Sequence, residues 1–297
     1  MLTFDFYSPE EEISHPLYRQ KKVQVFIKRD DLIHPYLSGN KWRKLKYPLQ
    51  EARRQGKQRL ITFGGAWSNH LLATACAGAK FGFQTFGFVR GEAVENPVLK
   101  LCSLFGMRLL FVDRTGYRDK RGLFDQHFAD DHEAFFIDEG GYSTLAAKGC
   151  SEMISELEKS YDHICCASGT GATAAGLLQG IQQAQLTTQL QVVPVLKGGQ
   201  FIQKAIADLG VSLDHRLTLQ LDYHFGGYAK TTPELIAFVK AFTQRTGILI
   251  EPTYTGKLCF ALHDMLQKDL IDPGQRILLV HTGGLTGLLG MLNKFDD

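Results

Sequence analysis

The chain alternates short apolar runs with longer amphipathic stretches along its whole length. Each apolar run covers about four to six residues, which is typical of strands buried on both faces, as in a parallel sheet. We expect such strands at residues 23–27, 60–63, 85–89, 109–112, 134–137, 163–167, 191–196, 247–250 and 277–280.

The stretches between these runs carry apolar residues at helical spacing. We expect helices at residues 41–55, 69–81, 96–105, 146–159, 170–184, 233–246 and 257–269. The repeating unit is a strand, a turn and a helix, which favours an α/β fold with an open, mostly parallel sheet and helices on both faces. In such sheets, ligands bind beyond the carboxyl ends of the strands.

Glycine adds to this picture, because 30 of the 297 residues are glycine and many stand close together. The clusters occupy residues 64–65, 140–141, 169–171, 198–199, 226–227 and 283–284. Several follow a predicted strand and precede a predicted helix, where free backbone N–H groups at a helix N-terminus can bind a phosphate. We interpret the pairs at 140–141 and 198–199 as ordinary turns.

Composition excludes several classes of protein. With 44% hydrophobic and 22% charged residues and a formal net charge of +2, the chain is an ordinary globular protein with no sign of a nucleic-acid or membrane partner. No apolar run approaches the roughly 18 residues of a membrane span. The six cysteines form no CxxC pair and no cluster with histidine at zinc spacing, so we predict no metal site. The first residues lack the pattern of a secretory signal, and we expect a cytoplasmic protein.

A hydroxyl-rich loop follows the predicted strand at 163–167. Its residues are Ser168, Gly169, Thr170, Gly171, Ala172 and Thr173. Glycine lets the backbone approach a ligand closely, and the hydroxyls and N–H groups donate hydrogen bonds. A capped strand–helix turn is the simpler interpretation, but the number of donors favours an anion site.

Lys41 stands in the first turn of a predicted helix, where the helix dipole disfavours a cation. That field and burial would lower its pKa and make the amine a usable nucleophile and base. On composition alone, however, Lys41, Arg43, Lys44 and Lys46 are better explained as a solvated basic helix face.

Two further segments place polar side chains next to predicted elements. Ser68, Asn69 and His70 open the helix predicted at 69–81, where they can cap the helix or bind a carboxylate. Hydroxyls also gather at residues 251–257 and 280–284, where ordinary turn chemistry is the alternative explanation.

Taken together, these segments resemble the pyridoxal-phosphate enzymes of the tryptophan-synthase-β fold, known as fold type II. Within that fold the chain is similar to the group of D-cysteine desulfhydrases and 1-aminocyclopropane-1-carboxylate (ACC) deaminases. The matching motifs, in the order of the family, are KRDD at 28–31, GNKWRKL at 39–45, GG at 64–65, SNH at 68–70, SGTGAT at 168–173, YTGK at 254–257 and HTGG at 281–284.

The resemblance implies roles for residues around pyridoxal 5′-phosphate. Lys41 would bind the cofactor covalently, which replaces the solvated-face interpretation for this lysine alone. Asn69 would lie against the 3′-oxygen of the cofactor, and the loop at 168–173 would hold its phosphate. Thr282, with Thr255 as the alternative, would meet the pyridine nitrogen.

On the substrate side, the resemblance places Ser68 where it could bind the carboxylate or help to move protons, with His70 beside it. Tyr254 and Tyr228 match positions where the family has tyrosines near the substrate. Lys41, Ser68 and Tyr254 are therefore the predicted catalytic residues, and the predicted substrate is a small amino acid.

One departure from the family bears on the reaction. ACC deaminases carry glutamate directly after the tyrosine of the YxGK motif, and this chain has Thr255 there. A hydroxyl at the pyridine nitrogen leaves the ring closer to neutral, which favours expulsion of a β-leaving group. We therefore expect β-elimination from a D-cysteine-like substrate, giving pyruvate, ammonia and a thiol.

Two alternatives remain at this point. The first is ACC deamination to 2-oxobutyrate and ammonia. The second is a pyridoxal-phosphate-binding protein with little turnover, because Leu72 stands where the family usually has arginine.

The resemblance also implies two open α/β domains with the cofactor between them. The larger domain would comprise residues 1–47 and 155–297, and the smaller one residues 48–154. Closure of the smaller domain on substrate would exclude water, and a homodimer is expected.

Overall fold

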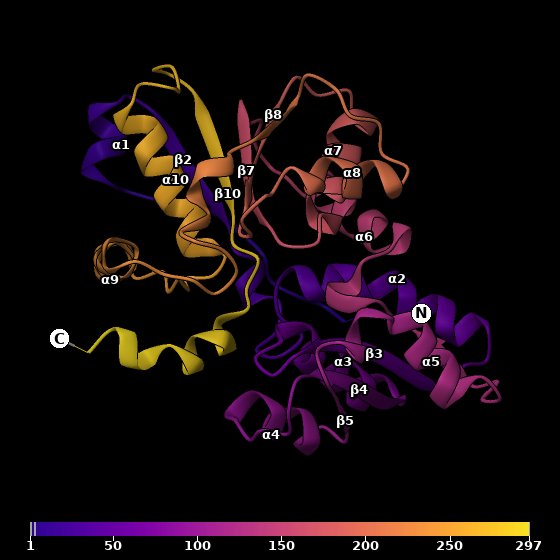
Figure 1. Cartoon of the computed structure of the whole chain (residues 1–297). Helices are drawn as coiled ribbons and strands as arrows, with labels where there is room; N and C mark the ends of the chain where they lie inside the picture. The colour runs from indigo at the N-terminus through magenta and orange to yellow at the C-terminus, as the bar shows by residue number, and fades with distance from the viewer. Residues whose placement is uncertain (1, 3, 297) are drawn as a thin grey trace.

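Two sheets form the frame of the molecule, and each is flanked by helices (Figure 1). The computed structural model describes residues 2 and 4–296. The larger sheet has six strands in the order β1-β2-β10-β7-β8-β9. Their bounds are β1 (Glu10–Glu12), β2 (Gln24–Lys28), β7 (His163–Ser168), β8 (Gln189–Pro194), β9 (Leu217–Leu219) and β10 (Arg276–Val280). All neighbours are parallel except β1 and β2, which are antiparallel.

The smaller sheet has four parallel strands in the order β5-β4-β3-β6. The strands are β3 (Arg59–Gly65), β4 (Gln84–Arg90), β5 (Arg108–Val112) and β6 (Ala134–Phe136). The α/β fold class predicted from the sequence, with two open and mostly parallel sheets, is confirmed.

Helices α2 (Asn40–Arg54) and α6 (Thr144–Ser155) lie between the two sheets in the view of Figure 1. Trp42, Leu45 and Leu49 on α2 pack against the small sheet and α3, whereas α6 packs against α7 below the large sheet. The remaining helices are α1 (Pro16–Gln20), α3 (Asn69–Phe81), α4 (Pro97–Leu104), α5 (Lys120–Phe128), α7 (Ala172–Gln183), α8 (Phe201–Asp208), α9 (Pro233–Thr246) and α10 (Thr255–Gln267).

Strand β10 is buried on both faces, as its apolar run predicts. Ile277 and Leu279 belong to the core under α9 and α10, whereas Leu278 and Val280 belong to the core under α6 and α7. All six cysteines are free and buried. Among the described residues, no helix is long and apolar enough to cross a membrane.

One predicted strand is wrong. Residues 248–250 form no regular element and join neither sheet. Ile248 and Ile250 are buried in the core between α9 and α10, so this run obtains its burial by packing instead of strand pairing. Two short strands, β1 and β9, and three helices, α1, α5 and α8, were not predicted, because they are short.

Candidate active site

The turn that carries Lys41 docks on the loop that follows β10. Gly39 precedes α2 with φ at +60°, and a side chain there would come within 1.9 Å of the Thr282 carbonyl oxygen. The Asn40 N–H donates to that same oxygen at 3.3 Å. Only glycine permits this approach, so two segments some 240 residues apart in the sequence meet beside the lysine.

The Lys41 amine has an unusual environment. Burial, followed by the positive charge of Lys44, lowers the pKa of Lys41 well below its ordinary value. The amine is therefore neutral at a lower pH than a solvated lysine, which is the form that attacks carbonyl groups and accepts protons.

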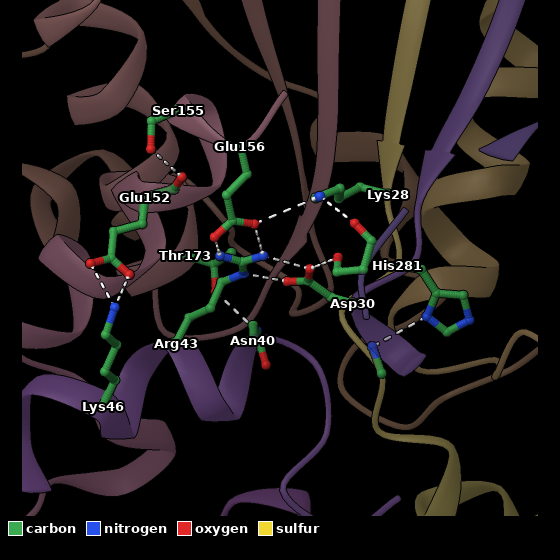
Figure 2. A network of polar contacts seen from close by, with 12 residues as sticks. Lys28, Asp30, Asn40, Arg43, Lys46, Glu152, Ser155, Glu156, Thr173 and His281 are labelled. Atoms are coloured by element: carbon green, nitrogen blue, oxygen red, sulfur yellow. Dashed lines mark hydrogen bonds and ion pairs between the residues drawn. The ribbon is translucent and has the colours of Figure 1, made fainter. Parts of the chain in front are cut away.

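Arg43, two residues further along α2, lies at the centre of a buried ion network (Figure 2). Its guanidinium binds Asp30 through two hydrogen bonds, from Nε at 2.6 Å and from Nη2 at 2.8 Å. It also binds Glu156 through two hydrogen bonds of 2.8 Å, and Lys28 lies 3.7 Å from Glu156. This network fastens the first turn of α2 to the end of β2 and to the residue after α6.

The interpretation of a solvated basic helix face is wrong for Arg43 and Lys44, which are both buried. Lys46 is partly exposed and pairs with Glu152 (Figure 2). The basic residues of α2 are therefore divided among an ion network, the interior and a surface pair, because the helix is covered on several sides.

The loop at 168–173 connects β7 to α7. Gly171 precedes the helix with φ at +93° and offers no side-chain cap to its first N–H groups. The hydroxyl oxygens of Ser168 and Thr170 are buried and have no hydrogen-bond partner. Asn40 Nδ2 donates to Thr173 Oγ1 at 2.9 Å, so the loop also contacts the turn of Lys41 (Figure 2).

Residues 140–141, which we interpreted as an ordinary turn, lie against the predicted site. A side chain at Gly140 would contact Thr170, and one at Gly141 would contact His70 and Lys44. The Lys44 Nζ donates to the Gly140 carbonyl at 3.3 Å. Lys44 thus brings a buried amine beside the hydroxyl-rich loop, a role that sequence patterns alone did not reveal.

Ser68, Asn69 and His70 stand at the start of α3. Ser68 caps the helix by accepting a hydrogen bond from Leu71 N at 3.2 Å. Asn69 Oδ1 accepts one from Thr286 Oγ1 at 2.9 Å, and a side chain at Gly284 would come within 2.7 Å of Asn69 Nδ2. Asn69 therefore contacts the loop after β10, on which the turn of Lys41 also docks.

His70 is buried, with Nε2 at 2.9 Å from Thr62 Oγ1 and with Nδ1 unpartnered. Because the Thr62 hydroxyl also contacts the Ile137 carbonyl at 2.9 Å, it donates to only one of these two acceptors. Burial, followed by the charges of Lys41 and Lys44, lowers the pKa of His70 well below its ordinary value, so the ring is neutral.

Tyr254 and Tyr228 lie together at the start of α10. Their ring centroids are 6.0 Å apart with an edge-to-face geometry. A side chain at Gly169 would contact the Tyr254 ring at 3.3 Å, so this tyrosine borders the hydroxyl-rich loop. Burial raises the pKa of both phenols, most strongly for Tyr254, and both therefore keep their protons at neutral pH.

The first turn of α10 offers a further unpartnered hydroxyl. Thr255 is fully buried and its Oγ1 has no hydrogen-bond partner. Thr282, which directly precedes the Gly283–Gly284 pair, is also buried. Glu251, in contrast, is engaged: its carboxylate accepts the backbone N–H groups of residues 253, 254 and 255 at 2.6, 2.7 and 2.8 Å. Burial raises the pKa of Glu251 to about 7, although these N–H groups act in the opposite direction.

The structure thus brings the predicted segments into one connected set. The buried hydroxyls of Ser168, Thr170 and Thr255 are polar atoms without partners, which are rare in a folded interior unless a ligand satisfies them. Together with a partly buried lysine of lowered pKa and an uncapped helix N-terminus, they fit a ligand that has a phosphate, an aldehyde and a ring nitrogen. Within the described residues, no group of three or more His, Cys, Asp or Glu side chains could hold a metal ion.

Comparison with known proteins supports a site for such a ligand. A family model described as pyridoxal-phosphate dependent enzyme matches residues 12–283. A protein of Thermotoga maritima named putative 1-aminocyclopropane-1-carboxylate deaminase is 31% identical and covers 91% of each chain. A D-cysteine desulfhydrase of Klebsiella pneumoniae is 32% identical over 89% of this chain and 88% of its own.

Solved structures extend the comparison. An ACC deaminase homologue superposes with a TM-score of 0.86 at 28% identity, covering 98% of this chain and 93% of its own. A fungal L-serine ammonia-lyase from Rhizomucor miehei has a TM-score of 0.76 at 16% identity, covering 98% of each chain, and shares the fold.

Proposed function

The chain belongs to the family of pyridoxal-phosphate-dependent enzymes, and from this premise we propose that it is a lyase acting on a small amino acid. The proposed reaction is β-elimination from a D-cysteine-like substrate, which yields pyruvate, ammonia and a thiol. The observation that carries this choice is Thr255, which presents a buried and unpartnered hydroxyl at the start of α10 where ACC deaminases have a carboxylate.

The residues present fit the cofactor. Ser168, Gly169, Thr170, Gly171, Ala172 and Thr173 would hold its phosphate, with Lys44 adding positive charge. Asn69 would contact the 3′-oxygen, and Thr255 or Thr282 would meet the pyridine nitrogen. When bound, pyridoxal phosphate supplies an aldehyde that captures amino groups and a ring that accepts electrons from Cα.

Lys41 would hold the aldehyde of the cofactor and would accept the Cα proton of the substrate as a neutral amine. Its lowered pKa supports the second role, because only a neutral amine can accept a proton. Ser68 would bind the carboxylate, with His70, two residues further along, beside it.

Tyr254 would donate a hydrogen bond to the departing sulfur, with Tyr228 beside it. Its raised pKa supports this assignment, since the phenol keeps its proton at neutral pH and stays a donor toward a developing thiolate. The Cα–H and Cβ–S bonds break, Lys41 takes the proton from Cα, the sulfur leaves as a thiol, and one water hydrolyses the remaining three-carbon fragment to pyruvate and ammonia.

ACC deamination is the second candidate, favoured by the names of several relatives. Incubation of the pure protein with D-cysteine and with ACC, followed by assays for sulfide and for 2-oxobutyrate, separates the two reactions. Sulfide and pyruvate from D-cysteine are expected. Formation of 2-oxobutyrate without sulfide would replace the proposal, and visible absorbance without any product from D- or L-amino acids would favour a binding protein.

The domain division, the location and the oligomeric state are part of the same proposal. We propose a smaller domain at 48–154 that closes on the larger one, in a cytoplasmic homodimer. The proposed boundaries fall in α2 and near the end of α6, the two helices that lie between the sheets. Crystals with and without a substrate analogue should differ in the interdomain angle, and light scattering should give twice the chain mass.

A further inference from the structure

Lys257 is a buried lysine without an acidic partner. It lies in the first turn of α10, with none of its surface exposed, and within the described residues no carboxylate forms an ion pair with it. Its ammonium instead donates to three backbone carbonyl oxygens, those of His224 and Gly227 at 2.8 Å and that of Val195 at 3.3 Å. A lysine has three donors, so this cation is fully satisfied by backbone alone.

Stability does not explain this arrangement. Moving an ammonium out of water is costly, and burial lowers the pKa of Lys257 to about 8, although the charge of Glu251 acts in the opposite direction. A leucine or methionine would fill such a position at lower cost. The carbonyl contacts therefore indicate that the lysine serves to hold the backbone segment that it binds.

The backbone that Lys257 holds is strained. Phe225, Gly226, Gly227 and Ala229 all have positive φ angles, of 52°, 91°, 127° and 55°. Two of these are not glycine, and such conformations persist only where the surroundings impose them. The loop makes two backbone hydrogen bonds of its own, Gly227 N to His224 O and Lys230 N to Gly227 O, and Lys257 binds the same two carbonyl oxygens.

The strained loop carries Tyr228, directly after the Gly227 carbonyl that Lys257 binds. The Tyr228 ring rests edge-to-face on Tyr254, which stands three residues before Lys257 and precedes the same helix. One turn of α10 thus presents one tyrosine and, through its lysine, sets the position of the other.

We propose that Lys257 is a positioning residue, whose ammonium fastens the loop at 224–229 so that Tyr228 stands beside Tyr254 at the substrate end of the site. The part played by Tyr228 rests on the proposed function. The fastening of the loop rests on the contacts of Lys257 alone.

The test compares Lys257→Met with Lys268→Met, in which an exposed lysine at the C-terminal end of the same helix loses its surface pair with Asp264. Hydrogen exchange on the full-length protein with its cofactor should be about 10- to 100-fold faster at 224–229 in Lys257→Met, because three charge-assisted hydrogen bonds are lost. Lys268→Met should leave it unchanged. Unchanged exchange in Lys257→Met would overturn the fastening, whether or not the proposed reaction is correct.

The second measurement asks whether Lys257 acts through Tyr228. Lys257→Met should keep the cofactor absorbance band and lower kcat/KM for D-cysteine by about 10- to 100-fold. In a Tyr228→Phe background, the same change should cost less than about threefold, because neighbours that act together are not additive. Full multiplication of the two losses, or loss of the absorbance band, would overturn the positioning role.

Lys257→Gln keeps two donors for the carbonyls and replaces Lys257→Met if that variant does not fold. It should recover part of both the exchange protection and kcat/KM. A glutamine variant as impaired as methionine in a folded protein would contradict the role of the hydrogen bonds. If wild-type protein turns over no amino acid, the proposed function fails while the exchange data still decide the fastening.

Discussion

The turn around Lys41 and the hydroxyl-rich loop at 168–173 lie side by side, yet they differ in how far their buried polar groups are hydrogen-bonded. Around the lysine turn, Arg43, Asp30 and Glu156 satisfy one another through four hydrogen bonds. In the loop, Ser168 and Thr170 bury hydroxyls that have no partner.

The difference separates two uses of buried polarity. A satisfied ion network holds backbone in place and costs a great deal to break, because a single missing partner leaves an uncompensated charge. An unsatisfied hydroxyl costs stability in the free protein and regains it when a ligand accepts its hydrogen bond. The first region therefore holds the backbone of the site in place, and the second provides hydrogen-bond donors for a ligand.

The largest effect on activity is expected for substitution of Lys41, which would bind the cofactor held by the hydroxyl-rich loop. Lys41→Ala should abolish the visible absorbance of the bound cofactor and lower turnover by more than about 1,000-fold, because it removes both the attachment point and the base. Absorbance spectra and product assays check this. A yellow and fully active Lys41→Ala protein would show that another lysine performs the chemistry.

Breaking the satisfied network should cost stability. Arg43→Met leaves the Asp30 carboxylate, which is fully buried, without its partner and should lower the free energy of unfolding by about 3–5 kcal/mol. Guanidinium titration measures the loss. Arg54→Met, which removes an exposed arginine from the surface pair with Glu51, is the matched control and should unfold like wild type. Equal stability of the two variants would refute the contrast between the regions.

Removing the unsatisfied hydroxyls should leave stability unchanged and weaken binding of the cofactor. The double variant Ser168→Ala with Thr170→Val should unfold like wild type or slightly later without cofactor, and bind pyridoxal phosphate about 10- to 100-fold more weakly. Equilibrium dialysis measures the affinity. Thr243→Val on α9 removes a hydroxyl that is also buried and unpartnered, and it should leave the affinity unchanged. A loss of affinity in Thr243→Val as large as in the double variant would contradict the assignment.

The smallest effect concerns the positive charge of Lys44 and its influence on the pKa of Lys41. The positive charge of Lys44 lowers the pKa of Lys41, so Lys44→Met should raise that pKa. In cofactor-free protein, the midpoint for acylation of Lys41 should therefore move to higher pH, as followed by peptide mass spectrometry. Lys46→Met, which loses only the pair with Glu152, should leave the midpoint in place. A downward shift in Lys44→Met would show the opposite coupling.

Much of the fold follows from local patterns. The helices α3 and α9 begin and end at the predicted residues, since Ser68 and Thr232 cap their starts and glycines in the left-handed conformation end them. The start of α10 was predicted two residues late, because the cap there is the Glu251 carboxylate, which reaches the helix across a turn.

The predicted site segments meet, but their long-range pairings were not readable in the sequence. Arg43 and Lys44 look like surface residues in a helix of mixed charge, and their burial depends on Asp30, Glu156 and Gly140. These partners lie up to 113 residues away, beyond the reach of periodicity. The glycine clusters at 169–171 and 283–284 were a better guide, because the conformational freedom of glycine is a local property of the backbone, although the contacts of the pair at 140–141 were missed.

The position of β10 in the large sheet constrains the order in which the two sheets can fold during synthesis. This strand, almost the last in the chain, lies between β2 and β7 and pairs with both. The large sheet therefore cannot close, and Gly39 cannot dock on the Thr282 carbonyl, until about 280 residues have left the ribosome. The smaller sheet, complete by residue 136, is free to fold well before that. A nascent chain thus carries its reactive lysine for most of its synthesis without the surroundings that activate it.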